Sequence, residues 1–77
     1  MPKEFLNETE LTALAKKFRK EAGIKRAQAA RDMGVSQTSI FHAEESPEEG
    51  LTKLRMRMIE KYSPFKVTGP VFYFERK

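Results

Sequence analysis

The chain has 77 residues, 39% of them hydrophobic and 34% charged, which is enough for one small domain with a single core. It has no cysteine and one histidine, which excludes disulfides and thiol chemistry and argues against a metal site or a His-assisted triad. No apolar stretch is long enough to cross a membrane, and the first residues lack the apolar run of a secretion signal. We therefore expect a cytoplasmic binding module without cofactor or metal, and not an enzyme.

The balance of charges favours a polyanionic partner. Fifteen Lys and Arg against eleven Asp and Glu give a net charge of +4, which suits nucleic acid. The charges are also segregated along the chain, so we expect one positive and one negative face. Two basic clusters flank one acidic cluster. The basic clusters are Lys16, Lys17, Arg19, Lys20, Lys25, Arg26 and Arg31, then Lys53, Arg55, Arg57 and Lys61; the acids are Glu44, Glu45, Glu48 and Glu49.

Hydrophobic spacing predicts a first helix from Asn7 to Ala22. Asn7 and Glu10 match a capping box, in which each side chain accepts a hydrogen bond from the backbone of the other residue. Gly23 follows the last apolar position, where a left-handed residue often closes a helix. The residues on one stripe of this helix are Leu11, Leu14, Ala15, Phe18 and Ala22.

Two short helices are predicted next, from Lys25 to Met33 and from Ser36 to Glu45. Three alanines favour the first of them, and Gly34 ends it. Ser36 is a good N-cap for the second. The connection between these two helices is therefore only a few residues long.

A loop from Ser46 to Leu51 and a fourth helix from Thr52 to Tyr62 complete the helical part. The segment before Thr52 is ambiguous, because Ser-Pro-Glu-Glu can also begin a helix, although Gly50 would then lie inside it. The spacing of apolar residues around Thr52 matches a hydrophobic staple, which favours Thr52 as the first residue of this helix. The side chains expected on the buried side are Leu54, Met58, Ile59 and Tyr62.

The C-terminal segment has a different composition. Pro64 disfavours helical geometry in the residue before it, so the helices end at Ser63. The aromatic and β-branched residues between Phe65 and Phe74 favour strands, interrupted at Thr68-Gly69-Pro70 by a turn or kink. We divide the chain into a helical domain, residues 1–62, and a strand tail, residues 63–77.

The most informative pattern is the pair of short central helices. Its elements are a Gly-apolar pair at Gly23, an alanine in the next helix, an apolar-Gly-Val-Ser turn at residues 33–36, and then Ile40 and Glu44. Two helices joined by such a turn are typical of a helix-turn-helix, whose second helix enters a DNA major groove. From Leu11 to Tyr62 the sequence resembles the phage Cro/repressor (XRE-type) helix-turn-helix family. The resemblance implies a mainly α, lambda-repressor-like domain of four or five helices with a short C-terminal strand or hairpin.

The outer face of the segment from Ser36 to Glu45 carries the predicted base contacts. Ile40 and Ala43 are expected to point inward, which leaves four side chains on the outer face. They offer an amide that can pair with an adenine edge, a hydroxyl with a methyl group, an aromatic ring and an imidazole. We expect the base-contacting residues to be Gln37, Thr38, Phe41 and His42. The resemblance implies base reading for the first two and for His42.

Each of these residues also has an ordinary interpretation. Gln37 and Thr38 fit solvated positions in a first helical turn. Phe41 fits packing on the fourth helix or in a dimer seam at least as well as a base contact. His42, without partners for a metal, fits either DNA contact or a plain surface position.

Phosphate contacts are predicted at the start of the second helix, because helix N-termini present free amides to anions. Arg26 stands where the resembled family commonly has a Gln that grips the DNA backbone; this departure changes the contact, although a guanidinium can bind phosphate bidentately. Lys16, Lys17 and Lys20 are better explained as a solvated helix face. The predicted phosphate-contacting residues are Lys25, Arg26, Gln28, Ser36 and Ser39.

The resemblance also implies a structural ion pair between Arg19 and Glu44, across the first and third helices. Loss of one partner from a partly buried pair costs about 3 kcal/mol or more, because the other charge is stranded.

An aromatic strand in the tail suggests dimerisation. The predicted dimerisation residues are Val71, Phe72, Tyr73 and Phe74. Pairing of this strand with its copy, as in Cro-like proteins, would place two recognition helices about 34 Å apart on a palindromic operator. An intramolecular hairpin that covers the helices is the alternative.

Together these features predict sequence-specific binding of double-stranded DNA by a small homodimeric transcriptional regulator, a repressor. The alternative is a protein-interaction module, such as an antitoxin whose aromatic C-terminal strand pairs with a partner protein.

Overall fold

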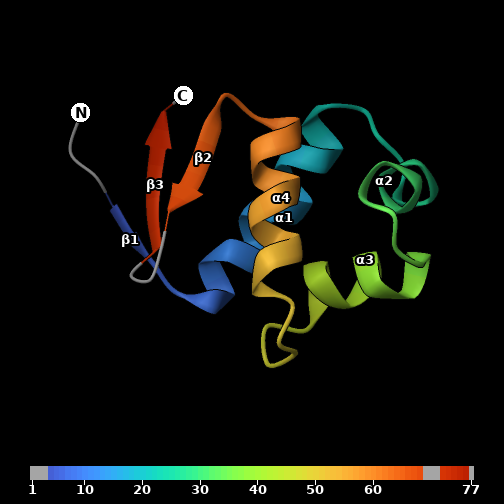
Figure 1. Ribbon diagram of the computed structural model, residues 1–77, viewed down its shortest axis with the longest axis horizontal. Helices are drawn as coiled ribbons and strands as arrows, with labels where there is room; N and C mark the ends of the chain where they lie inside the picture. The colour runs from blue at the N-terminus through green and yellow to red at the C-terminus, as the bar shows by residue number, and fades with distance from the viewer. Residues whose placement is uncertain (1–3, 69–71, 77) are drawn as a thin grey trace.

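The expected four helices form, and three short strands make a sheet beside them (Figure 1). The computed structural model describes the backbone of residues 4–68 and 72–76, and side chains from residue 7 to residue 67. In chain order the elements are β1 (Glu4–Leu6), α1 (Glu8–Glu21), α2 (Arg26–Met33), α3 (Gln37–Glu45), α4 (Thr52–Tyr62), β2 (Phe65–Thr68) and β3 (Phe72–Arg76). This is a small, mainly α domain, and all four helix predictions are confirmed to within a residue or two.

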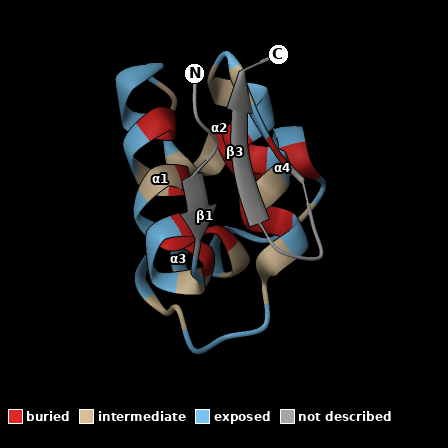
Figure 2. Cartoon of the chain, turned by 90° about the vertical axis from the view of Figure 1, so that its left-hand side faces the viewer, coloured by how far each residue is buried: buried red, intermediate tan, exposed pale blue. Residues whose placement is uncertain are grey.

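Helices α1 and α4 lie side by side at the centre of the molecule, with the sheet on one side and α2 and α3 on the other (Figure 1). Figure 2 views the molecule from the sheet side, and the buried positions of the helices lie behind the strands. The buried apolar side chains are Leu11, Ala15, Phe18, Ala29, Ala30, Met33, Ile40, Ala43, Leu54, Met58, Ile59 and Val67. Of the predicted stripes, Leu14 and Tyr62 are only half-buried, and Ala22 is exposed because it caps the end of α1.

Local capping by a side chain explains where α1 and α3 begin. The predicted capping box is present: the Glu10 amide donates to Asn7 Oδ1 at 2.8 Å, and the Asn7 amide donates to Glu10 Oε1 at 3.0 Å. The amide of Ser39 donates to Ser36 Oγ at 3.1 Å and starts α3. Helix α4 starts at Thr52 through a tertiary contact, in which the Thr52 hydroxyl donates to Glu8 Oε2 at 2.7 Å.

The C-terminal strand is paired inside the chain. The sheet order is β1-β3-β2 with both pairs antiparallel, so β3 is the central strand. Leu6 lies opposite Phe72, and Val67 lies opposite Phe74. The hairpin alternative is therefore correct for β2 and β3, and the predicted pairing of this strand with its copy in a second subunit is not available while β1 and β2 flank it.

Two further features concern the sheet and its packing on the helices. Strand β1 was not expected, because three residues are too few to show a period-two pattern. The tail is also part of the helical core and not an appendage: Val67 is buried, and the Phe65 ring lies 6.0 Å from that of Phe18. Of the predicted dimerisation residues, the backbone of Phe72, Tyr73 and Phe74 belongs to β3, and Val71 lies outside the described residues.

Arg55 is fully buried, although the sequence placed it in a basic cluster. Its Nε donates to the carbonyl of Ala43 at 2.9 Å, and its Nη2 donates to the carbonyl of Ser46 at 2.7 Å. Its Nη1 donates to Glu8 Oε1 at 2.8 Å and to the carbonyl of Glu49 at 3.1 Å. The carbonyls at the C-terminus of a helix lack intrahelical donors, so this one side chain closes α3 and shapes the loop after it.

We expect Arg55→Ala to lower the free energy of unfolding by about 3 kcal/mol, because buried carbonyls and the Glu8 carboxylate lose a charged donor. Urea unfolding followed by circular dichroism measures the change. Lys53→Ala, at an exposed position of the same helix, is the control and should shift stability by less than about 0.5 kcal/mol. Equal stability of the two variants would show that the Arg55 contacts do not hold the loop.

Candidate nucleic-acid interface

Helices α2 and α3 are joined by a tight turn that two backbone bonds define. The amide of Val35 donates to the carbonyl of Ala30 at 3.0 Å, and that of Gly34 donates to the carbonyl of Arg31 at 3.3 Å. This is a Schellman closure, and Gly34 adopts the left-handed conformation that it requires, with φ of 71°. Ser36 then caps α3, so the chain changes direction within three residues.

Helix α3 has a fully buried face and an exposed face, as predicted. Ile40 and Ala43 have no exposed surface, whereas Gln37 and Thr38 are exposed in the first turn. Phe41 is 45% exposed and is the large hydrophobic residue most open to solvent among those described. Three of the four predicted base-contacting residues therefore lie on the outer surface of one helix.

His42 is less open than the other three. Its side chain is half-buried, its Nδ1 lies 3.4 Å from Ser46 Oγ, and its ring meets that of Phe41 edge to face at 5.7 Å. The imidazole is thus held against the end of α3 by its neighbours. It borders the exposed face and does not project from it.

The predicted ion pair between Arg19 and Glu44 is present and buried. Nε and Nη2 of Arg19 both donate to the Glu44 carboxylate, the latter at 3.0 Å, and Nη1 donates to the carbonyl of Ile24 at 2.6 Å. The Glu44 side chain has no exposed surface. The Glu44 carboxylate therefore joins α1 to α3, and Arg19 joins both to the connection that precedes α2.

Arg26 belongs to the same network. Its Nε donates to Glu44 Oε1 at 3.0 Å, and its Nη2 donates to Glu45 Oε2 at 2.9 Å. Its guanidinium carbon also lies 5.1 Å from the centre of the Phe41 ring, a cation–π distance. The residue predicted to bind phosphate is thus at the N-terminus of α2 but is already engaged by two carboxylates and a ring.

The remaining predicted phosphate contacts differ in availability. Lys25 is exposed at the N-cap of α2. The Gln28 amide bonds along α2 instead, donating to Asp32 Oδ1 at 2.8 Å and accepting from Arg31 Nη2 at 2.9 Å. Ser36 and Ser39 lie together at the start of α3 with their hydroxyl oxygens 3.1 Å apart.

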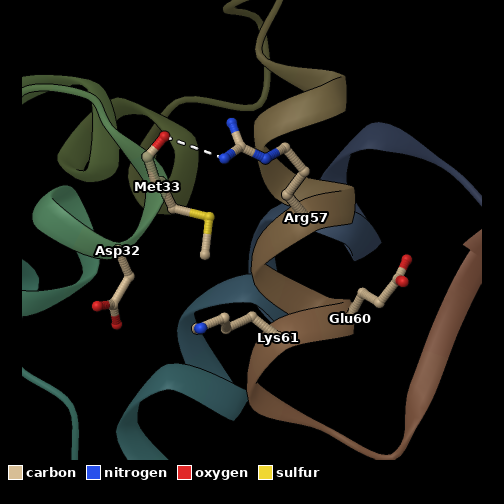
Figure 3. Close-up of a pocket in the computed structure, with 5 residues that line it drawn as sticks. All are labelled: Asp32, Met33, Arg57, Glu60 and Lys61. Carbon is tan, nitrogen blue, oxygen red and sulfur yellow. Dashed lines mark hydrogen bonds between the residues drawn. The ribbon is translucent and has the colours of Figure 1, made fainter.

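A groove of about 390 Å³ separates α2 from α4 (Figure 3). Arg57 crosses it and donates to the carbonyl of Met33 at 3.0 Å, which ties α4 to the last residue of α2. Asp32 on one rim accepts a hydrogen bond from the Tyr62 hydroxyl at 2.7 Å. The lining mixes both signs of charge, and its residues are Asp32, Met33, Arg57, Glu60 and Lys61.

Hydrogen bonds from Tyr62 first, and then from Gln28, lower the pKa of Asp32 from its usual value. Burial, and then the hydrogen bond to Asp32, raise the pKa of Tyr62. Both shifts favour the hydroxyl as donor and the carboxylate as acceptor. This bond fastens the C-terminal turn of α4 to α2.

Comparisons with protein-family models, with curated proteins and with solved structures find no match for this chain. Within the described residues, no cluster of His, Cys, Asp and Glu has the composition to hold a metal ion. Among the helices described, none has the length and apolar character to cross a membrane.

We expect Gly34→Ala to cost about 1 kcal/mol of unfolding free energy, because an L side chain is strained at its positive φ. An added Cβ would meet no atom within 4 Å, so the cost comes from the backbone alone. Gly50→Ala, also in open space but without a positive φ, is the matched control and should show no such loss in thermal or urea unfolding.

Tyr62→Phe should raise the pKa of Asp32 toward its usual value, because the largest contribution to the lowered pKa is removed. A carboxyl-carbon NMR titration measures it. A carboxyl whose folded pKa is depressed contributes stability above its unfolded pKa and loses it as pH falls through the folded value. The variant should therefore show a weaker acid dependence of stability, and an unchanged Asp32 titration would contradict the assignment.

Proposed function

We propose that this protein is a sequence-specific DNA-binding transcriptional regulator of the Cro/repressor (XRE-type) helix-turn-helix kind, which acts as a homodimer on a palindromic operator and represses transcription. The observation that carries the proposal is the division of α3 into two faces: Ile40 and Ala43 are wholly buried, and Gln37 and Thr38 are exposed. A helix held by one face and polar on the other has the form of a recognition helix.

Rigid support of α3 strengthens this interpretation. Glu44 binds it to α1 through Arg19, and Arg55 binds its last carbonyls to α4. A base-reading helix must be held within a fraction of an ångström, because each bidentate contact depends on the position of two atoms. The C-terminal end of α3 is therefore held by two buried charged groups.

In the proposed complex α3 lies in the major groove, and its first turn meets the base edges. Gln37 bonds to an adenine, Thr38 meets a base edge or a thymine methyl, and Phe41 offers apolar contact to thymine methyls. His42 lies beside them. The N-termini of α2 and α3, with Lys25, Ser36 and Ser39, approach the phosphates.

The proposal keeps the homodimer but changes the strands that would pair between the two subunits. The central position of β3 leaves the outer edges of β1 and β2, and not β3, for any strand pairing between subunits. The antitoxin alternative depended on an open aromatic strand, and β3 is flanked on both sides. DNA binding is therefore the one function that we propose.

Selection of bound sites from random duplexes tests the proposal. We expect a palindromic consensus with half-sites about one DNA turn apart, and log affinity that falls with log salt by about 0.9 per phosphate contacted. Gln37→Ala should flatten discrimination between the selected site and random DNA, whereas Lys25→Ala should weaken both alike. No duplex binding, or a salt-independent affinity, would refute the function; equal losses in the two variants would remove Gln37 as a base reader.

A further inference from the structure

Glu45 holds two cations at the edge of the proposed DNA-binding face. Its Oε2 accepts from Lys16 Nζ at 2.6 Å and from Arg26 Nη2 at 2.9 Å, so one carboxylate oxygen joins α1, α2 and α3. The side chains involved are about one third exposed. These contacts lie at the solvent boundary, where an anionic ligand can compete for the same cations.

The two carboxylates that bind Arg26 differ in how easily they are exchanged. Glu44 is fully buried and also receives two bonds from Arg19, so its bond to Arg26 Nε is sheltered. Glu45 is open to water, and exposed ion pairs are weakened by solvent and salt. Arg26 is therefore anchored at Nε, and its outer Nη2 is the part that can move to a different oxygen.

A phosphate and Glu45 are attracted to the same two cations. A phosphate that approaches Arg26 Nη2 or Lys16 Nζ must either displace the Glu45 carboxylate or share the cation with it against their mutual repulsion, since Glu45 is the last residue of α3 and stays nearby. The hydrogen bond from Lys16 and the nearby cations lower the pKa of Glu45, so this competitor stays ionised at neutral pH. The charges of Lys16 and Arg26 are thus partly neutralised before any DNA backbone approaches.

On these contacts, and resting on the proposed function, we propose that Glu45 is a specificity-determining residue that suppresses the phosphate-driven part of DNA binding by occupying Lys16 and Arg26. Binding to random DNA comes almost wholly from phosphate contacts. Fewer available cations therefore mean weaker binding to random sequence, and base contacts from α3 then make a larger share of the total.

Glu45→Gln tests this inference, with Glu48→Gln as the matched control. Both remove one negative charge at an exposed position, but Glu48 makes no ion pair within the described residues. We measure affinity for a random-sequence duplex over a tenfold salt range, and confirm folding by circular dichroism. Glu45→Gln should steepen the log–log salt slope by about 0.9 for each released cation that reaches a phosphate, an eightfold larger loss of affinity across the range. Glu48→Gln should leave the slope unchanged.

A second variant tests whether the steeper salt slope comes from the cations that Glu45 binds. Arg26→Gln combined with Glu45→Gln should remove the part of the added slope that Arg26 supplies. If the wild-type protein binds DNA but Glu45→Gln and Glu48→Gln show equal salt slopes, the role of Glu45 is refuted. The proposed function would then stand. Absence of salt-dependent binding by the wild-type protein would instead refute the proposed function itself.

Discussion

A buried carboxylate at Glu44 sets the relative position of three helices. It lies on α3, accepts from Arg19 on α1 and from Arg26 at the start of α2, and has no exposed surface. A charge removed from water is tolerated only where opposite charges and hydrogen bonds replace the solvent, and here two guanidiniums do so. The outer face of α3 is exposed in one defined orientation because its inner face carries this group.

Several arginines bind the backbone inside the molecule, whereas several lysines are exposed. Arg19, Arg55 and Arg57 donate to backbone carbonyls at or near helix ends, and the planar guanidinium serves there as a multiple donor. Lysines such as Lys17, Lys20 and Lys25 are exposed. A net positive charge is therefore a poor guide to the cations available to a ligand, since much of it is used inside the molecule.

The helices could be predicted well because each has residues nearby in the sequence that favour its beginning or its end. Asn7, Gly34 and Ser36 act on neighbours three to five residues away, so their roles are visible in the sequence. The inward direction of Ile40 and Ala43 follows equally from helical spacing. The Arg19–Glu44 pair was expected only through the resemblance to the Cro/repressor family, since no local pattern connects positions so far apart.

The features that the sequence did not predict all depend on distant contacts. Arg55 looks like any other cation of a helix surface until Glu8, from the start of α1, and the loop carbonyls surround it. The same holds for Glu45, whose two partners lie on other helices, and for β1, whose pairing strand is almost a chain length away. Periodicity and capping describe one element at a time, so they carry no information on such partners.

The position of β3 has a consequence for the order of folding. Glu4 pairs with Phe74. The β1–β3 ladder therefore cannot form until the chain has been synthesised almost to its last described residue. During synthesis on the ribosome β1 emerges first and has no strand to bind until all four helices have followed. Such distant pairings close late and slowly. The β1–β3 ladder is therefore completed only once β3 has been synthesised, whereas the contacts among the four helices join residues closer together in the sequence.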